Sequence, residues 1–229
     1  MAAQSTENTP RSDEQHEHGE RVHPDIQQFL AGAGSTLFVG LLYLALPDDL
    51  SIGPRWLVLV IVAVLLAPSL IAALIWRRAL PLRLARRLAQ AQVVVATLAL
   101  IGSLGLLVSS IVNFQQGRKL LVPAAILWSI NVLVFTLWYW ELDGGGPLGR
   151  TEEKNRAVDY QFIQERDGEP PNWKPGFVDY LYLAFNTATA FSPTDTMPLT
   201  PLAKLMMMAE SIVSLVIVVL LVGRSVNIL

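Results

Sequence analysis

Five long apolar segments constrain this chain more than any other feature of its sequence. The first four contain no charged side chain, and each segment has the roughly 20 residues that a helix needs to cross the hydrocarbon of a bilayer. We therefore predict an all-α, polytopic membrane protein with five transmembrane helices. The segments are Phe29–Leu46, Trp56–Trp76, Ala91–Val112, Leu120–Trp140 and Leu205–Val222.

The composition agrees with this class of protein. Hydrophobic residues make up 52% of the 229 residues, and the mean hydropathy is +0.44, as expected of a membrane protein. There is no cysteine, which excludes disulfides and thiolate metal sites. A net charge of -2 predicts no nucleic-acid partner. The expected location is a cell membrane, the bacterial plasma membrane, with the lipid bilayer as partner.

Residues 1–28 are polar and lack an apolar period, so we predict a disordered tail. No charged region, apolar region and cleavage site follow one another there, so no cleaved signal peptide is expected. The tail holds His16, His18 and His23 near glutamates. Such a cluster is able to bind a divalent metal, but a solvated tail is the simpler interpretation, and we expect neither a metal nor a cofactor.

Residues 29–140 form the predicted four-helix region. Tryptophans and a tyrosine stand at segment ends, where amphipathic rings favour the membrane interface: Trp56, Trp76, Trp138, Tyr139 and Trp140. Glycines inside the segments predict close approach between helices: Gly32, Gly34, Gly40, Gly102 and Gly105.

Five arginines follow the second segment: Arg77, Arg78, Arg83, Arg86 and Arg87. A voltage sensor would carry them on a spanning helix at every third position, but Pro81 interrupts this connector and the spacing differs. We predict a cytoplasmic segment at the interface, where each arginine gains about 1 kcal/mol from anionic lipid headgroups.

Residues 141–175 are predicted to be a polar, solvated loop with a short strand within 157–163. The glycine triplet Gly144–Gly146 is not expected to bind phosphate, because no strand precedes it and no Gly-Lys-Ser/Thr follows it.

Residues 176–229 combine a short helix, a polar turn and a full spanning helix. Phe177–Ala190 is apolar but would be only about 21 Å long as a helix, too short to cross a bilayer. The turn that follows is rich in Ser, Pro, Thr and Asp, and irregular backbone at membrane depth requires protein or water around it. This order predicts a re-entrant pore-loop helix before the last transmembrane helix.

At these residues the chain resembles the pore domain of the potassium-channel superfamily. That family has a pore helix ending in Thr-x-Thr, the filter Thr-Val-Gly-Tyr-Gly-Asp, and a Pro-x-Thr-Pro turn before the inner helix. Thr187, Thr189 and Asp195 match the threonines and the aspartate. The turn is matched by Pro198, Thr200 and Pro201, followed by Ala203 and Lys204. The filter itself departs from the pattern, because this chain has Ala190, Phe191, Ser192, Pro193 and Thr194 there.

Most of the chain also resembles a family of five-span bacterial membrane proteins that carries a domain-of-unknown-function label. That resemblance implies the architecture and supplies no activity.

Pro193 fixes its φ angle and lacks an N–H group, so a stack of backbone carbonyls selective for potassium is not expected. In a symmetric homo-tetramer, the side-chain oxygens of this turn would form rings that favour monovalent cations with weak selectivity: the hydroxyls of Ser192, Thr194 and Thr196 and the carboxylates of Asp195. We therefore predict a cation channel or channel-derived pore. The alternatives left open are that this turn is a closed plug, and that the protein is a non-conducting membrane protein with a structural or partner-binding role. No catalytic constellation is found, so no enzyme is predicted.

Three polar residues lie at predicted membrane depth. Glu210 on the inner helix is a functional candidate by default, unless it snorkels to the interface or pairs with Lys204. Asp179 is expected to complement the dipole of the short helix. Asn131 is expected to form an interhelical hydrogen bond.

The positive-inside rule places the N-terminal tail, the Arg77–Arg87 connector and residues 141–175 in the cytoplasm, together with most of the 17 Lys and Arg residues. The channel resemblance implies the opposite orientation, with the pore loop outside. We favour the orientation given by the charges.

Overall fold

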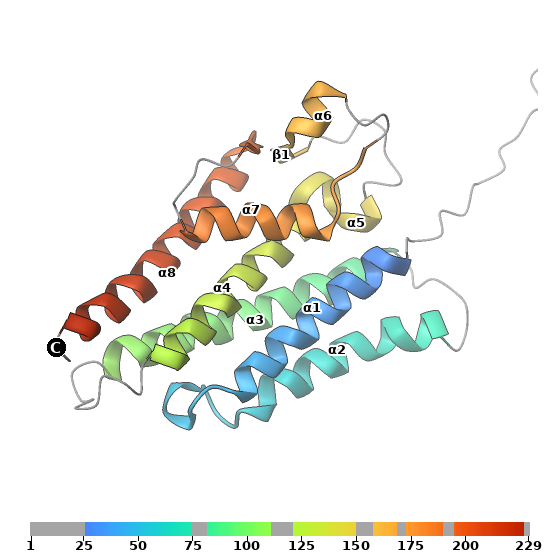
Figure 1. Ribbon diagram of the computed structural model, residues 1–229. Coiled ribbons are helices and arrows are strands. Elements are labelled where there is room, and N and C mark those ends of the chain that lie inside the picture. Colours follow the sequence, from blue (N-terminus) through green and yellow to red (C-terminus); the bar gives the residue numbers. More distant parts are fainter. Residues whose placement is uncertain are drawn as a thin grey trace, which may run out of the picture.

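The fold was analysed in a computed structural model, which describes residues 26–74, 82–110, 121–149, 158–168, 173–189 and 195–226. The described chain is mostly helical, as predicted (Figure 1). The five longest helices are α1 (Ile26–Leu44), α2 (Trp56–Leu74), α3 (Leu82–Ser110), α4 (Leu121–Leu142) and α8 (Pro201–Val226). The shorter elements are η1 (Asp48–Leu50), η3 (Asp143–Gly145), α5 (Gly146–Gly149), α6 (Ile163–Asp167), α7 (Phe177–Thr189), β1 (Tyr160–Gln161) and β2 (Met197–Pro198).

Helix α4 is the centre of the molecule. It packs against α1, α3, α7 and α8, while α2 covers α1 and α3 on the far side (Figure 1). Twelve of its residues are buried, as expected of a helix at the centre of a bundle. Trp138 on α4 also donates a hydrogen bond of 2.8 Å to the Thr97 hydroxyl on α3. Every element discussed below is positioned, directly or through α7, on this helix.

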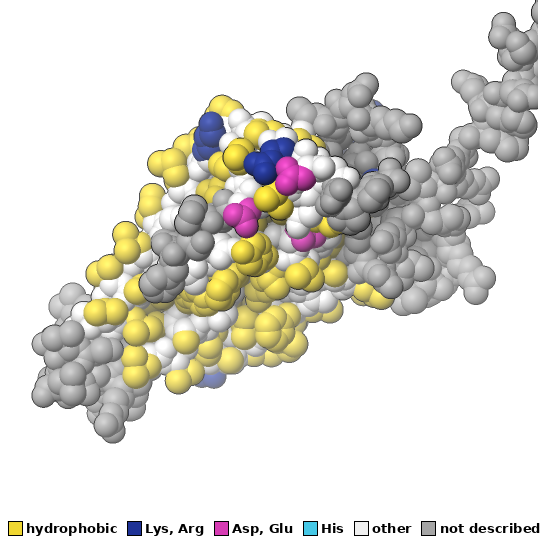
Figure 2. Space-filling view, turned by 45° about the horizontal axis from the view of Figure 1, so that its top comes forward, with side chains coloured by type: hydrophobic (Ala, Val, Ile, Leu, Met, Phe, Trp, Pro, Cys, Tyr) yellow, Lys and Arg dark blue, Asp and Glu magenta, His cyan; other side chains and the backbone are white. Residues whose placement is uncertain are grey.

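Within the described ranges, three helices are long and apolar enough to cross a membrane: Arg83–Ser109, Leu121–Gly145 and Pro201–Gly223. Helices α1 and α2 contain shorter apolar stretches, Leu30–Leu44 and Trp56–Pro68. Apolar side chains cover much of the visible surface, and most of the charged side chains visible there gather near the end where β1 and α6 lie (Figure 2). These features are consistent with a membrane protein.

Helix α3 begins earlier than the sequence predicted. Arg83, Arg86 and Arg87 belong to its first two turns rather than to a separate connector, and Arg77 and Arg78 lie outside the described residues. A helix of 29 residues is about 43 Å long, whereas the hydrocarbon core is about 30 Å thick. The helix is therefore longer than the hydrocarbon core is thick.

Aromatic residues at the end of α4 lie in the core instead of at a membrane interface. Tyr139 is 0% exposed and Trp140 is 2% exposed. Trp140 packs edge-on against Phe177 of α7, with ring centroids 5.0 Å apart. The prediction of an aromatic interface belt was therefore wrong at these two positions, because α7 covers them. Trp56 is 55% exposed, as the prediction requires, and Trp76 lies outside the described residues.

The glycines divide into two groups. A Cβ atom at Gly32 would lie 2.5 Å from the Trp140 ring, and one at Gly40 would lie 2.8 Å from Leu59 of α2. Gly102 likewise faces Ile52. Close approach between helices is thus confirmed at Gly32 and Gly40, whereas Gly102 faces the loop that precedes α2. At Gly34 and Gly105 nothing lies within 4 Å, so the prediction was wrong there.

The 141–175 segment is not simply a solvated loop. Asp143 is 1% exposed, Tyr160 is 0% exposed and Phe162 is 4% exposed. The predicted strand is present as β1, and it pairs antiparallel with β2, which places Tyr160 opposite Pro198 and Gln161 opposite Met197. The sequence gives no indication of this partner, which lies beyond α7.

Candidate functional site

Helix α7 is the short helix of the predicted re-entrant segment. It has 13 residues, about 20 Å at 1.5 Å per residue, which is too short to cross a bilayer. Its buried face packs on α4 and α8 and consists of Tyr180, Leu183, Ala184, Thr187 and Ala188. The opposite face is exposed at Val178, Tyr182 and Phe185. The helix is therefore amphipathic in packing, with one face largely exposed among the described residues.

The first turn of α7 is capped as predicted. The Asp179 carboxylate accepts a 2.7 Å hydrogen bond from the Gly176 backbone N–H. A carboxylate in a first turn satisfies a free donor and complements the helix dipole. Asp179 thus has a structural role.

The chain returns after α7 to the point from which it departed. Besides the β1–β2 pairing, the Leu199 N–H donates to the Asp159 carbonyl at 2.8 Å. The Thr200 hydroxyl donates to the Asp159 carboxylate at 2.5 Å and also accepts the Ala203 N–H at 3.2 Å, which caps α8. Residues 159–161 and 197–200, which precede and follow α7 in the sequence, are thus held side by side.

Asp143 connects β1 and α7 to the end of α4. One carboxylate oxygen accepts the backbone N–H groups of Asp159, at 2.7 Å, and Tyr160, at 3.2 Å. The other accepts the Tyr180 hydroxyl of α7 at 2.5 Å. A buried carboxylate that accepts several donors is well satisfied. Asp143 therefore joins α4, β1 and α7 at one point.

Glu210 is the second buried carboxyl group, and its environment is different. It lies ten residues into α8, which begins at Pro201 rather than at Leu205 as predicted, and it is 0% exposed. One of its oxygens accepts a hydrogen bond from the Tyr139 hydroxyl of α4. Its other oxygen, Oε1, has no partner among the described residues. Glu210 neither snorkels nor pairs with Lys204, whose side chain is exposed.

Asn131 lies beside Glu210 and forms the predicted interhelical bond. Its Nδ2 donates to the Ser214 hydroxyl at 3.0 Å and to the Glu210 backbone carbonyl at 3.4 Å. Its Oδ1 has no partner among the described residues. Ser211, which follows Glu210 on α8, donates its hydroxyl to the Thr187 carbonyl of α7 at 3.3 Å. The polar contacts around Glu210 thus extend to the last turns of the short helix.

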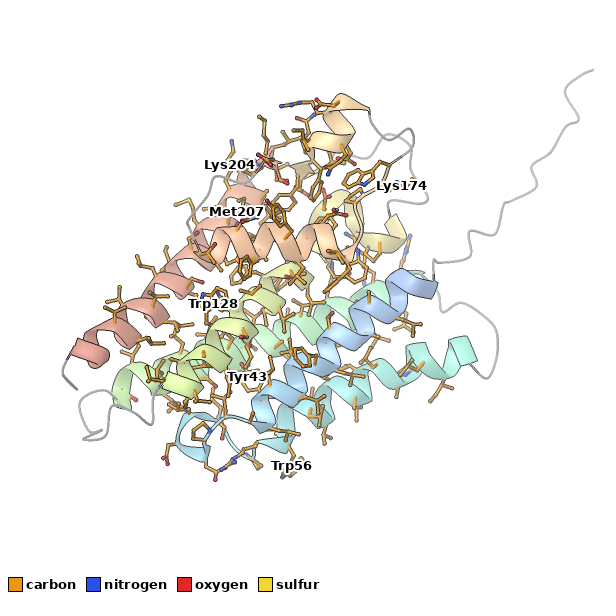
Figure 3. All side chains as sticks on the ribbon, viewed as in Figure 1. Tyr43, Trp56, Trp128, Lys174, Lys204 and Met207 are labelled. Carbon is orange, nitrogen blue, oxygen red and sulfur yellow. The ribbon has the colours of Figure 1, made fainter. Side chains whose placement is uncertain are left out.

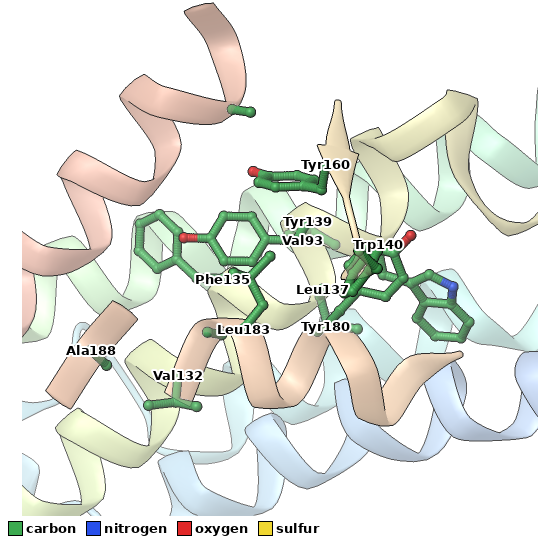
Figure 4. Close-up of a cluster of buried hydrophobic side chains, with 13 residues drawn as sticks. Val93, Val132, Phe135, Leu137, Tyr139, Trp140, Tyr160, Tyr180, Leu183 and Ala188 are labelled. Carbon is green, nitrogen blue, oxygen red and sulfur yellow. The ribbon is translucent and has the colours of Figure 1, made fainter. Parts of the chain in front are cut away.

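Tyr160 completes this buried group. Its ring lies 5.1 Å from the Tyr139 ring, centroid to centroid, and the two hydroxyls point to the same side, that of α8 (Figure 4). Burial raises the pKa of the Tyr160 hydroxyl far above its usual range, and the carboxylates of Asp159, Asp143 and Glu210 raise it further. This hydroxyl has no partner among the described residues. Tyr160 is a neutral phenol within reach of both buried acids.

The predicted filter residues are only partly described. The hydroxyls of Thr187 and Thr189 donate within α7, to the carbonyls of Leu183 and Phe185. Asp195 is exposed just before β2. The remaining candidates lie outside the described residues: Ala190, Phe191, Ser192, Pro193 and Thr194.

Sequence reasoning found Glu210 and Asn131 but missed Asp143, Tyr139 and Tyr160. An acidic residue at membrane depth can be recognised in a sequence because apolar residues surround it. Asp143 lies in a polar stretch instead, and tyrosines are typical of membrane interfaces. Among the described residues no group of three His, Asp or Glu side chains could hold a metal ion, and the histidine-containing tail is outside them.

No family model matches this chain, and neither the curated proteins nor the solved structures contain a significant match to it.

Proposed function

We propose that this chain is a multi-pass protein of the bacterial plasma membrane, with five spans, which forms a weakly selective pore for monovalent cations in a homo-oligomer, a tetramer. The observation that supports it best is the closed path of residues 159–200. The chain leaves β1, forms a helix too short to cross, and returns to pair with β1 before α8 begins. A short helix packed on a spanning helix, entered and left on the same side, is the arrangement of a re-entrant pore loop.

An oligomer would supply what a single subunit lacks. Irregular backbone at membrane depth must be covered by protein or face water, and the free faces of α7 and α8 offer the surface for neighbouring subunits. Large apolar side chains on these faces are exposed, among them Tyr182 at 57% and Leu205 at 61%. Around a central axis, the Asp195 side chains would form a ring of negative charge that attracts cations.

A second candidate is a non-conducting membrane protein that uses the same fold for a structural or partner-binding role. The observation in its favour is the orientation of the polar groups. Thr187 and Thr189 direct their hydroxyls to their own helix, and Glu210 faces α4 of its own subunit. None of these groups is free to line a shared axis in the described conformation.

The two candidates are separated by mass and flux. Purified protein in detergent should have the mass of a tetramer, and liposomes that contain it should pass sodium and potassium at comparable rates. A monomeric particle, or tetramers without flux at any tested voltage or pH, would contradict conduction and leave the non-conducting role.

Replacing Asp195 by Asn should reduce the preference for cations over anions several-fold, because it removes one negative charge per subunit from the pore. The reversal potential under a salt gradient measures this preference. Asp167→Asn is the matched control, since Asp167 is also exposed but lies on α6 and pairs with Arg166. Equal reversal potentials for the two variants would show that Asp195 lies away from the conduction path.

The orientation in the membrane can be tested by labelling single introduced cysteines, because the chain contains no native cysteine that would react as well. Lys174 and Lys204 lie at one end of the molecule and Trp56 at the other (Figure 3). With the N-terminal tail in the cytoplasm, Asp49→Cys, on η1 close to Trp56, should react with an impermeant maleimide in intact cells. Lys174→Cys should react only after the cells are permeabilised. The reverse pattern would establish the orientation of potassium channels.

A further inference from the structure

Glu210 and Asp143 are both buried carboxyl groups, but their partners differ. Asp143 has two backbone N–H donors and one hydroxyl donor, whereas Glu210 has one hydroxyl donor and a free Oε1. Among the described residues no Lys or Arg lies within ion-pair distance of Glu210. An ionised carboxylate that is buried without a counter-charge is strongly unfavourable, and such a group is neutralised instead.

Among the described residues, the neighbours of Glu210 accept or donate hydrogen bonds but bring no positive charge. Its side-chain donor is Tyr139 of α4, and Asn131 leaves Oδ1 without a donor. Thr187 of α7 binds Ser211 through its carbonyl, and Tyr180 of α7 is engaged by Asp143. Tyr160 of β1 is a neutral phenol, and Lys204 of α8 itself is exposed. Within the described structure, no positive group offsets a charge on Glu210.

We propose that Glu210 is an exchangeable proton-binding site within the membrane, formed by α4, α7 and α8. A proton fits better than a metal ion, because it neutralises the carboxylate without requiring the several oxygen ligands of an alkali ion. Protonation turns Oε1 into a donor, and both Asn131 and Tyr160 offer oxygens without a donor. Deprotonation leaves a charge that must draw water into the contact between α7 and α8, beside the Ser211–Thr187 bond. The site does not depend on conduction.

The test is infrared difference spectroscopy of the full chain in liposomes over a pH series. The wild type should show the carbonyl band of a protonated carboxylic acid at neutral pH, and the band should disappear as the pH rises. Glu210→Gln should lack the band and keep the helical circular dichroism spectrum, since the neutral amide has the shape of the neutral acid. Asp195→Asn, at an exposed carboxylate, is the control that keeps the band.

Tyr139→Phe distinguishes proton binding from a merely structural role. Loss of its hydroxyl should shift the band, because the carbonyl loses a hydrogen bond, and should move the titration midpoint to higher pH, because the ionised form loses its donor. Three results would overturn the proposal: identical spectra for the wild type and Glu210→Gln, a Glu210 band that never titrates, or a band that sodium removes at constant pH. The last would identify an alkali ion as the ligand.

Discussion

Replacing Asp143 by Ala should lower the free energy of unfolding by roughly 3–5 kcal/mol, because three donors lose a buried acceptor and each unsatisfied group costs about 1–3 kcal/mol. The substitution leaves the N–H groups of Asp159 and Tyr160 and the hydroxyl of Tyr180 without this acceptor. All of them lie where α4, β1 and α7 meet. Reversible unfolding of detergent-solubilised protein by SDS measures the change.

Tyr180→Phe is the matched variant. It removes one of the three donors and keeps the ring, which is 0% exposed and packs edge-on against Phe162. A single lost hydrogen bond should cost about 1 kcal/mol. If Asp143→Ala were no more destabilising than Tyr180→Phe, the two backbone bonds of Asp143 would contribute nothing to stability.

Replacing Gly40 by Val should destabilise the protein by about 1–3 kcal/mol through overpacking, because α1 and α2 are in contact at this position. Even a Cβ atom there would lie 2.8 Å from Leu59 Cδ1 and 3.1 Å from Leu59 Cα, so backbone as well as a side chain must move. The same SDS unfolding measurement applies.

Gly34→Val on the same helix is the control, since nothing lies within 4 Å of its added Cβ. A surface change of this kind is expected to alter stability by no more than about 0.5 kcal/mol. Equal losses for the two variants would place the cost in the helix propensity of valine rather than in the contact between α1 and α2.

The helices were predictable because their signal is local. Long apolar runs define α3, α4 and α8, and the short length of 177–189 identifies α7 as a helix that cannot cross. Asp179 was predictable for the same reason, since a cap acts within its own first turn. Even so, the starts of α3 and α8 were predicted several residues too late. The first turns of these helices are amphipathic, so they did not belong to the continuous apolar segments from which the helices were predicted.

The candidate site depends on pairs that are distant in sequence, and here prediction failed in part. Glu210 was identified by its apolar surroundings, but its partner Tyr139 was assigned to the membrane interface, a preference of the residue type that α7 overrides. Asp143 binds residues that follow a glycine-rich stretch, and the hydrophobic periodicity of a sequence does not indicate hydrogen bonds of this kind. The proposed pore function remains a prediction, since residues 190–194 lie outside the described structure.

The pairing of β1 with β2 closes the segment between them into a loop with fixed ends. The ladder and the Asp159–Thr200 bond hold these ends, while α7 packs on α4 and α8 within the loop. For a flexible loop, each doubling of length adds only about 0.6 kcal/mol of closure entropy. A change in the number of residues between α7 and β2 is thus expected to leave the register of α8 on α4 unchanged.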